Sequence, residues 1–291
     1  MRNDLVSVVV ITYNSQDTII ETLNSIYEQT YKSLELIVSD DCSTDNTIDI
    51  VKKWIRQHGK RFIRCGISIA KKNGGVVANC NKGIRRANGD YIKEIAGDDI
   101  LKKDCITECL NCMYQGEYDV VYSRLKCFGD AKMVKEMEKS LKTSYVALKS
   151  NDQKIIKEYY LKNNFIPTPS VFFKRKVFDS IGGYDCRFPF WEDAPFFMKV
   201  INKKYRVGFI DKETILYRVS SSSLGHAASN GISSYVDFKF MQSQVRYYYW
   251  MRLWVLLRNK MFKEAWEEHC RMFPQLLNLC KYCLKIYQRN R

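Results

Sequence analysis

The sequence lacks the features of several well-known protein classes. No Gly-x-Gly-x-x-Gly motif follows its first apolar stretch, which argues against a dinucleotide site of the Rossmann type. No apolar run reaches the ~18 residues that a membrane-spanning helix requires, and the first residues contain no apolar segment typical of a signal peptide. The 11 cysteines are therefore expected to be reduced thiols of a cytoplasmic protein, soluble or peripheral to a membrane.

Zinc ligands in a common arrangement are also missing. Cysteines at i, i+3 spacing occur at Cys109 and Cys112 and again at Cys280 and Cys283, but both pairs lie in helical patterns. The chain has only 3 histidines, and no pair of them lies nearby. Buried thiols are therefore expected at both places rather than metal sites.

The composition is that of a globular protein with an excess of positive charge. Of the 291 residues, 46% are hydrophobic and 27% are charged, and the formal net charge is +15. Residues 226–291 hold eleven Lys or Arg against four acidic residues, so this last quarter carries +7. Nucleic acid, anionic lipid and nucleotide diphosphates are all partners that such a charge attracts.

Strands that alternate with helices predict the fold class. Residues 6–11 and 34–38 are nearly continuous apolar runs, typical of strands covered on both faces of a parallel sheet, and residues 91–95 form a shorter one. Helical apolar spacing follows the first two runs. The alternation predicts an α/β fold with a doubly wound, mostly parallel sheet, in which right-handed crossovers bring the loops after the strands to one edge.

Polar residues gather in three loops at that predicted edge, namely residues 12–17, residues 40–45 and the pair Asp98 and Asp99. Ligands bind at this edge in open α/β sheets. Adjacent carboxylates suit Mg²⁺ or Mn²⁺ that bridges phosphate oxygens. The alternative is that each loop merely caps its helix, which is less natural for four aspartates that converge on one edge.

Other local patterns give weaker expectations. Thr18 and Glu21 have the spacing of a helix capping box, and Asp193 is predicted to cap a helix whose first turn holds Pro195. Residues 128–150 are rich in Lys and Ser without a clear period. We therefore expect them to form a variable, mobile loop.

Five stretches resemble glycosyltransferase family 2, which comprises inverting, nucleotide-sugar-dependent enzymes of the GT-A fold. Residues 7–14 (SVVVITYN) are similar to the first strand and nucleoside loop of that family, and residues 38–47 to its DDGSTD element. Residues 73–83 resemble its N-x-G-x-x-x-A-R-N-x-G helix. Gly97-Asp98-Asp99 resembles its metal-binding DXD-type motif, and Glu192-Asp193 resembles its ED pair.

The resemblance covers most of the chain and implies roles for the matching residues. It implies that Asp193 is the catalytic base, that Asp99 and Asp98 bind Mn²⁺ or Mg²⁺, and that Asp41 hydrogen-bonds the nucleoside base. The implied nucleotide-sugar site consists of Thr12, Tyr13, Asn14, Asp17, Asp40, Asp41, Asn73 and Asp98. The implied reaction moves a sugar, expected to come from a UDP-sugar, to a hydroxyl of a glycan or lipid-linked acceptor in cell-surface polysaccharide biosynthesis.

Three departures from the family pattern affect this expectation. Cys80 stands where the helix motif usually has Arg, so some diphosphate contacts must come from elsewhere. The remaining candidates for those contacts are Lys71, Lys72 and Arg218. Ala96 occupies the first Asp position of the fuller DxDD form, which leaves Asp99 as the better metal ligand. Cys42 replaces a usual Gly, a change that is tolerable if its φ is negative.

The expected organisation is a GT-A catalytic domain at 1–225, with a nucleotide-binding half at 1–100 and an acceptor half at 101–225, followed by a basic, aromatic helical tail at 226–291. Tail aromatics among arginines could stack on nucleic-acid bases. Helical spacing of Trp250 and Trp254 favours packing on the catalytic domain or attachment to the anionic inner face of a membrane. We expect no nucleic-acid partner.

Other functions remain as alternatives. The main one is a membrane- or nucleic-acid-binding protein with a non-catalytic nucleotide-binding domain. A nucleotidyltransferase is disfavoured because the Gly-rich start with a following Lys is missing, and a processive polysaccharide synthase because the chain has neither spanning helices nor a Gln-x-x-Arg-Trp motif.

Overall fold

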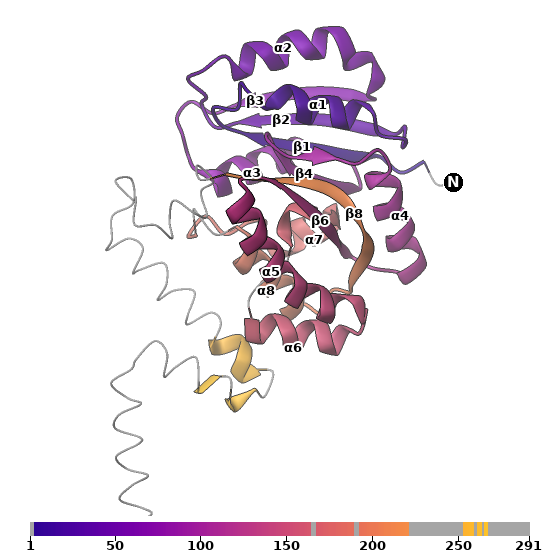
Figure 1. Ribbon diagram of the computed structural model, residues 1–291, viewed down its shortest axis with the longest axis vertical. Coiled ribbons are helices and arrows are strands. Elements are labelled where there is room, and N and C mark those ends of the chain that lie inside the picture. Colours follow the sequence, from indigo (N-terminus) through magenta and orange to yellow (C-terminus); the bar gives the residue numbers. More distant parts are fainter. Residues whose placement is uncertain are drawn as a thin grey trace, which may run out of the picture. The chain divides into compact units, whose positions relative to one another are not determined.

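An eight-stranded mixed sheet forms the centre of the computed structural model (Figure 1). The structure describes residues 3–163, 167–188, 192–220, 253–258, 261–263 and 265–266. The chain divides into two units, Met1–Ile232 and Ser233–Arg291, and the sheet belongs to the first. In the second, residues 253–258 are helical, and the Arg258 guanidinium lies 5.1 Å from the ring centroid of Trp254.

The strand order in the sheet is β3-β2-β1-β4-β7-β6-β8-β5. The strands are β1 (Val6–Thr12), β2 (Leu34–Asp40), β3 (Arg64–Ile69), β4 (Tyr91–Ala96), β5 (Ile100–Leu101), β6 (Val120–Gly129), β7 (Phe172–Lys174) and β8 (Val207–Val219). The first four strands pair in parallel, β6 pairs in parallel with β8, and β7 runs antiparallel to β4 and β6. The predicted doubly wound, mostly parallel sheet is confirmed.

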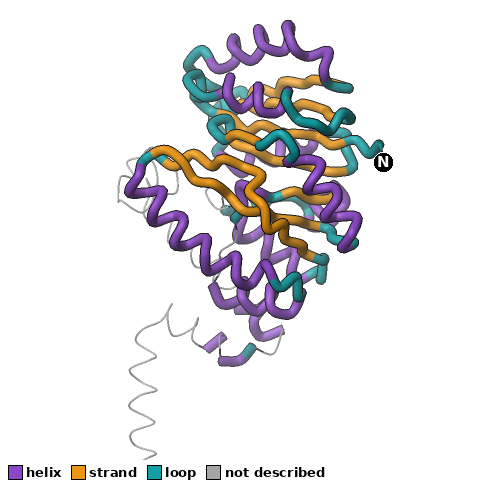
Figure 2. The backbone as a smooth tube through the Cα atoms, turned by 45° about the vertical axis from the view of Figure 1, so that its right-hand side comes forward, coloured by secondary structure: helices purple, strands orange, loops and turns teal. Residues whose placement is uncertain are grey.

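Helices lie against both faces of this sheet (Figure 2). They are α1 (Ile19–Tyr27), α2 (Thr47–His58), α3 (Val76–Arg86), α4 (Cys105–Gly116), α5 (Ala131–Lys149), α6 (Gln153–Asn163), α7 (Arg175–Ile181) and α8 (Asp193–Asn202), with short 3-10 turns η1 (Gly59–Arg61) and η2 (Thr168–Ser170). The core on one face joins Val8 and Val10 of β1 to Leu23 of α1 and Trp54 of α2. On the other face α3 packs closely, since a Cβ at Gly83 would lie 2.7 Å from Val9 Cγ1.

The strand order places a topological switch point between β1 and β4. The chain leaves β1 towards β2 and β3, and then returns through α3 to lay β4 on the opposite side of β1. Adjacent loops diverge at such a point and leave a crevice at the carboxyl ends of the strands. The loops that follow β1 and β4 contain Thr12 to Asp17 and Asp98 to Asp99, so the predicted site residues lie at this position.

Two local predictions were wrong. Residues 131–149 form helix α5 instead of a loop. Asp130 caps the start of this helix, because its Oδ1 accepts a hydrogen bond from the Met133 N–H at 3.0 Å. The helix packs beside β6 and β8 through a short buried face that includes Leu141 and Leu148. The capping box of α1 is also absent, because the Thr18 hydroxyl donates to the Gly97 carbonyl at 2.8 Å and makes no capping bond.

Two further expectations concern thiols and membrane spans. Cys109 is a buried free thiol, as predicted, and Cys112 is half-buried, whereas Cys280 and Cys283 lie outside the described residues. Within the parts of the chain that the structure describes, none of the helices has both the length and the apolar character to cross a bilayer.

Candidate active site

Hydrogen bonds hold the loops after β1 and β2 together at the carboxyl edge of the sheet. The backbone N–H of Asn14 donates to Ser43 Oγ at 2.8 Å, and Asn14 Oδ1 accepts from the Thr44 N–H at 2.8 Å. The Ser15 N–H donates to Thr47 Oγ1 at 2.8 Å. These bonds satisfy backbone groups that the strand ends leave free, so the two loops form one surface.

The loop after β4 lies against the same surface. The Gly97 N–H donates to the Ile11 carbonyl at 2.9 Å, and a Cβ at Gly97 would lie 3.0 Å from Thr12 Oγ1. Thr12 is buried, and within the described residues its hydroxyl has no hydrogen-bond partner. A buried hydroxyl without a partner costs free energy, which makes Thr12 a group that a ligand would satisfy.

Asp40 and Asp41 are both buried, and each of their carboxylate oxygens accepts one hydrogen bond from a nearby donor. Asp40 accepts hydrogen bonds from the backbone N–H and the hydroxyl of Ser43, with an N–O distance of 2.9 Å for the first. Asp41 accepts from the N–H groups of Gly74 at 2.9 Å and Gly75 at 2.7 Å, at the start of α3. Both carboxylates therefore shape loops, and their nucleoside contacts stay a prediction.

Cys42, between these aspartates and Ser43, does not meet the condition set from the sequence. Its φ is +67° rather than negative. A side chain in the left-handed region costs roughly 1–2 kcal/mol relative to glycine. The hydrogen bonds of Asp40 to Ser43 tighten this turn and hold Cys42 in the strained conformation.

The Asp98 and Asp99 pair has few donors. Asp99 is 2% exposed, and its Oδ1 accepts a hydrogen bond from the Arg218 backbone N–H at 2.9 Å. Burial and the neighbouring Asp98 raise the pKa of Asp99 to about 8, and burial raises the pKa of Asp98. Two carboxyl groups in this state gain from a proton or a cation between them.

The donor set of this pair suits Mg²⁺ or Mn²⁺. Asp98 and Asp99 both offer carboxylate oxygens as ligands. Among the described residues, no cluster of three or more His, Cys, Asp or Glu side chains could hold a metal ion. Mg²⁺ in nucleotide sites is commonly bound by one or two carboxylates, with water and phosphate oxygens in the remaining positions. Asp98 and Asp99 therefore fit a metal that is completed by a diphosphate.

Arg218 is the cation next to these aspartates. Its Nε donates to the Asp98 carbonyl at 2.9 Å, and its Nη2 lies 2.5 Å from Glu21 Oε2. Its guanidinium carbon stands 4.5 Å from the ring centroid of Phe128. Of the three candidates for diphosphate contacts, the structure brings Arg218 to the aspartate pair, whereas Lys71 and Lys72 are exposed.

Asp193 is the first residue of α8. Its Oδ2 accepts a hydrogen bond from Thr168 Oγ1 at 3.2 Å, and its Oδ1 accepts from the Ala194 N–H at 2.7 Å. Burial, with Asp193 next to it, raises the pKa of Glu192 to about 8. Asp193 therefore accepts two hydrogen bonds at the start of α8, and Glu192 has an environment that favours the acid.

A further buried carboxyl group, Glu94, was missed in the sequence. Burial raises the pKa of Glu94 to about 7, its Oε1 accepts from the Cys80 thiol at 3.5 Å, and its buried Oε2 has no partner among the described residues. Cys80 therefore lies against an acid. The alternation of side chains along β4 could have indicated that Glu94 points to the face of the sheet that α3 covers, where Cys80 lies.

Tyr217, on β8, responds to acidic groups of both the β4 loop and the start of α8. Burial and the charges of Asp99, Asp98 and Glu192 raise the pKa of Tyr217. The predicted residues Tyr13, Asn14, Asp17 and Asn73 are exposed in the loops of the same edge, and Asn73 Oδ1 accepts from the Gly75 N–H at 3.0 Å.

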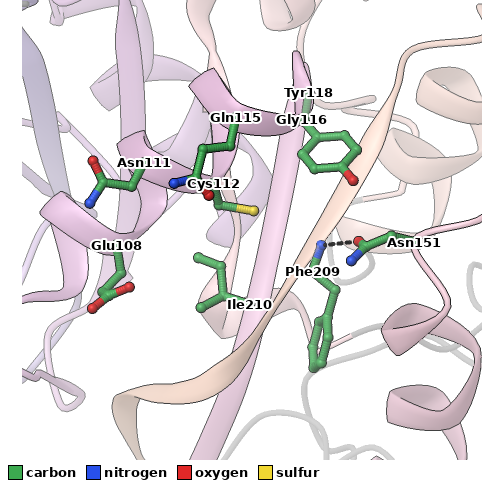
Figure 3. A pocket seen from close by; sticks show the side chains of 9 residues that line it. All are labelled: Glu108, Asn111, Cys112, Gln115, Gly116, Tyr118, Asn151, Phe209 and Ile210. Carbon is green, nitrogen blue, oxygen red and sulfur yellow. Dashed lines mark hydrogen bonds between the residues drawn. The ribbon is translucent and has the colours of Figure 1, made fainter.

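A separate hollow of about 470 Å³ lies between α4 and β8 (Figure 3). Asn151 Oδ1 accepts a hydrogen bond from the Phe209 N–H at 2.9 Å beside it, and Cys112 and Tyr118 are among its lining residues. None of the predicted site residues lines this hollow. The candidate active site therefore rests on the carboxylates and loops at the sheet edge.

Two relatives among the curated proteins are similar to part of the chain. It is 36% identical over 111 residues to the putative teichuronic acid biosynthesis glycosyltransferase TuaG of Bacillus subtilis, a match that covers 38% of this chain and 42% of that protein. It is 29% identical over 173 residues to the poly(ribitol-phosphate) beta-glucosyltransferase of Bacillus spizizenii, covering 57% of this chain and 27% of that protein. The matched region is thus less than half of either relative.

Two solved structures share the fold. Staphylococcus aureus TarS in complex with UDP-GlcNAc superposes with a TM-score of 0.63 at 21% identity, over 85% of this chain and 66% of that chain. The mannosyltransferase PcManGT from Pyrobaculum calidifontis, in complex with GDP-Man and Mn²⁺, gives a TM-score of 0.58 at 18% identity, over 98% and 81%. The predicted GT-A fold is confirmed.

The family model described as glycosyl transferase family 2 matches residues 7–182. This range is more than half of the chain and contains the three loops at the sheet edge together with η2 and α7. The chain belongs to glycosyl transferase family 2.

Proposed function

We propose that this protein is an inverting glycosyltransferase that moves a sugar from a UDP-sugar to a hydroxyl of a glycan or lipid-linked acceptor in cell-surface polysaccharide biosynthesis. The observation that carries the proposal is the Asp98 and Asp99 pair at the carboxyl end of β4, where Asp99 is buried with one backbone donor and the Arg218 guanidinium binds the Asp98 carbonyl. An inverting transfer needs one base and a neutralised leaving group on opposite sides of the reacting carbon. The names of the relatives, which concern teichuronic acid and poly(ribitol phosphate), support the polymer class.

The nucleoside is proposed to lie over the loops after β1 and β2. Tyr13 is 47% exposed there and offers an aromatic face, and Thr12 offers a hydroxyl without a partner in the described chain. Asp41 keeps lone pairs on both oxygens beyond those that accept from Gly74 and Gly75. A donor group of the base can therefore bind Asp41 without breaking the start of α3.

The diphosphate is proposed to lie at the carboxyl end of β4. Asp99, with Asp98, would hold Mn²⁺ or Mg²⁺, which supplies Lewis-acid neutralisation of the departing nucleoside diphosphate. Arg218 already lies against this pair and is held by Glu21 at 2.5 Å. Exchange of Glu21 for a phosphate oxygen would bring the guanidinium to the leaving group without moving β8.

Asp193 is proposed to remove the proton from the acceptor hydroxyl. Its two hydrogen bonds, from Thr168 and Ala194, orient the carboxylate at the start of α8. Because the pKa of Glu192 is raised to about 8, we propose that this neighbour donates a hydrogen bond and does not remove the proton. Only one base is needed, in contrast to the two carboxylates of glycoside hydrolases.

We also propose that residues 226–291, after a catalytic domain at 1–225, attach the enzyme reversibly to the anionic cytoplasmic face of a membrane. Each Lys or Arg near such a surface contributes about 1 kcal/mol, and eleven occur in this segment. Trp250 lies outside the described residues, and Trp254 is helical beside Arg258. Deletion of residues 240–291 should abolish sedimentation with anionic vesicles and spare UDP binding. Full-length protein that does not sediment with such vesicles at low salt would contradict the proposed membrane attachment.

A screen of nucleotide sugars by thermal shift, with and without Mn²⁺, tests the main proposal. A donor at about 100 times its dissociation constant stabilises the folded state by about 2.7 kcal/mol. The expected result is stabilisation by a UDP-sugar that increases when Mn²⁺ is added. Stabilisation by no nucleotide sugar would contradict the proposal.

A further inference from the structure

Lys93, in the middle of β4, is a fully buried lysine. It is 0% exposed, and its Nζ donates to the carbonyl oxygens of Pro169 at 2.9 Å and Val171 at 3.1 Å. Burial lowers the pKa of Lys93. No ion pair of Lys93 occurs among the described residues, so the two carbonyls of the η2 region are its main partners. A buried lysine is costly, which makes a purely space-filling role a poor explanation.

The turn that Lys93 contacts is held from several directions. Within η2, the Ser170 N–H donates to the Pro167 carbonyl at 3.0 Å, and the Val171 N–H donates to the Thr168 carbonyl at 2.9 Å. From β6, the Ser123 N–H donates to Ser170 Oγ at 3.0 Å. Pro167 and Pro169, on either side of Thr168, also restrict the backbone. The turn η2 therefore holds Thr168 in one orientation.

Thr168, the first residue of this turn, contacts the proposed base. Its hydroxyl is 3.2 Å from Asp193 Oδ2, and the Ala194 N–H occupies Oδ1 at 2.7 Å. The Ala194 carbonyl in turn accepts from the Tyr160 hydroxyl at 2.7 Å, which fixes the first turn of α8 against α6. With the backbone of Ala194 held, the Thr168 bond determines how the Asp193 carboxylate is rotated about its last side-chain bond.

We infer that Thr168 is a positioning residue for Asp193, and that Lys93 keeps Thr168 in place by binding the carbonyls of Pro169 and Val171. The inference rests on the proposed function, in which Asp193 is the base. It has a geometric consequence, because β4 carries Lys93 and leads directly into Asp98 and Asp99. One central strand then fixes both the metal end and the base end of the site, and rigid elements hold reacting groups more accurately than loops do.

The first test compares Thr168→Val with Thr168→Ser. Removal of the hydroxyl should lower kcat by roughly 10- to 100-fold, a part of the 10²- to 10⁴-fold effect of a general base, and leave KM for the donor and the Kd for UDP within about two-fold. The Ser variant should restore most of kcat. Thr107→Val, which removes a hydroxyl that bonds Thr30 on the surface, serves as the matched control.

The second test uses Lys93→Met and hydrogen exchange, which does not depend on catalysis. Amides of residues 168–174 and 192–202 should exchange faster than in the wild type, and those of residues 6–41 should be unchanged. UDP binding should persist, which shows that the fold has formed. Unchanged exchange in the first two segments would overturn the role of Lys93.

The two tests separate this inference from the proposed function. A wild-type protein that binds UDP-sugar and transfers sugar, with a Thr168→Val variant of equal kcat, would overturn the role of Thr168 and leave the proposed function standing. A wild-type protein that transfers nothing to any hydroxyl acceptor would refute the proposed function and the positioning role together, while the exchange experiment still decides whether Lys93 holds η2.

Discussion

Two pairs of adjacent aspartates follow buried parallel strands in this protein, and they differ in what surrounds them. Asp40 and Asp41, at the end of β2, accept four hydrogen bonds from Ser43, Gly74 and Gly75. Asp99, after β4, accepts one from the Arg218 backbone, and burial raises its pKa to about 8.

The difference shows how one dipeptide can serve two purposes. A carboxylate whose two oxygens both accept hydrogen bonds stabilises a loop, because its charge is largely compensated. A buried carboxylate with too few donors favours a proton or a metal ion. The Asp40 and Asp41 pair is therefore part of the scaffold, and the Asp98 and Asp99 pair is the one proposed to bind the metal.

Asp193 is expected to give the largest effect. It accepts two hydrogen bonds, as Asp40 and Asp41 do, but it is proposed to take part in the reaction. Asp193→Asn should lower sugar transfer by roughly 10²- to 10⁴-fold and leave UDP and Mn²⁺ binding intact. Steady-state kinetics with calorimetry on the same samples measure both. Glu192→Gln is the control and should cost much less in kcat. Near-normal turnover by the Asn variant would assign the base to another carboxylate.

Asp41→Ala should produce the next largest effect, and it should act on stability as well as on binding. The change leaves the N–H groups of Gly74 and Gly75 without their acceptor, which costs about 1–3 kcal/mol. UDP binding should weaken even without metal, since the nucleoside surface is altered. Urea denaturation and metal-free calorimetry measure the two effects, with Asp49→Ala, at an exposed aspartate of α2, as control. A variant as stable as the wild type would contradict the claim that Asp41 stabilises the loop and the start of α3.

Glu94 extends the comparison to a third buried carboxyl group and predicts a pH dependence. Its pKa is raised from 4.5 to about 7, so between these values the folded state retains a proton that the unfolded state releases. Stability should therefore fall as the pH rises through this range, by up to about 1.4 kcal/mol per pH unit. Glu94→Gln should reduce this slope, and the part contributed by Asp99 and Glu192 should remain. Denaturation at pH 4.5 to 7.5 measures it, and identical slopes in both proteins would contradict the assignment.

The smallest effect is expected from Glu21→Gln. The variant keeps the shape of the side chain but loses the charge that holds Arg218, in an ion pair worth about 1 kcal/mol or less because Glu21 is partly solvent-exposed. UDP affinity in the presence of Mn²⁺ should rise slightly, by no more than a few-fold, as the guanidinium becomes available to phosphate. A loss of affinity would instead mean that Glu21 positions Arg218 for the ligand.

The first strands of the fold were predictable because their sequence pattern and their burial coincide. The nearly continuous apolar runs of β1 and β2 lie between helices on both faces, so local propensity and tertiary environment agree. Helix α5 was missed because its buried face includes Ser144 and Ala147, which do not stand out as apolar among its lysines. The positive φ of Cys42 was indicated only by the glycine that the family usually has there, since a cysteine itself carries no turn signal.

The residues of the site were predictable only where a motif marks them. Asp98, Asp99 and Asp193 lie in such motifs. Glu21 was interpreted as part of a capping box, yet it binds Arg218, which is 197 positions away in the chain. Lys93 likewise contacts a turn 76 positions away. Contacts at these separations are created by the sheet topology, and no local pattern in a single sequence indicates them.

The most direct test of the central claim is calorimetric titration of UDP, with and without Mn²⁺, into the wild type, Asp99→Asn and Asp41→Asn. The account predicts that Mn²⁺ strengthens UDP binding to the wild type and to Asp41→Asn, even where the overall affinity of the latter is lower, and that this gain disappears in Asp99→Asn. An Asp99→Asn variant with the same Mn²⁺-dependent gain as the wild type would contradict the account.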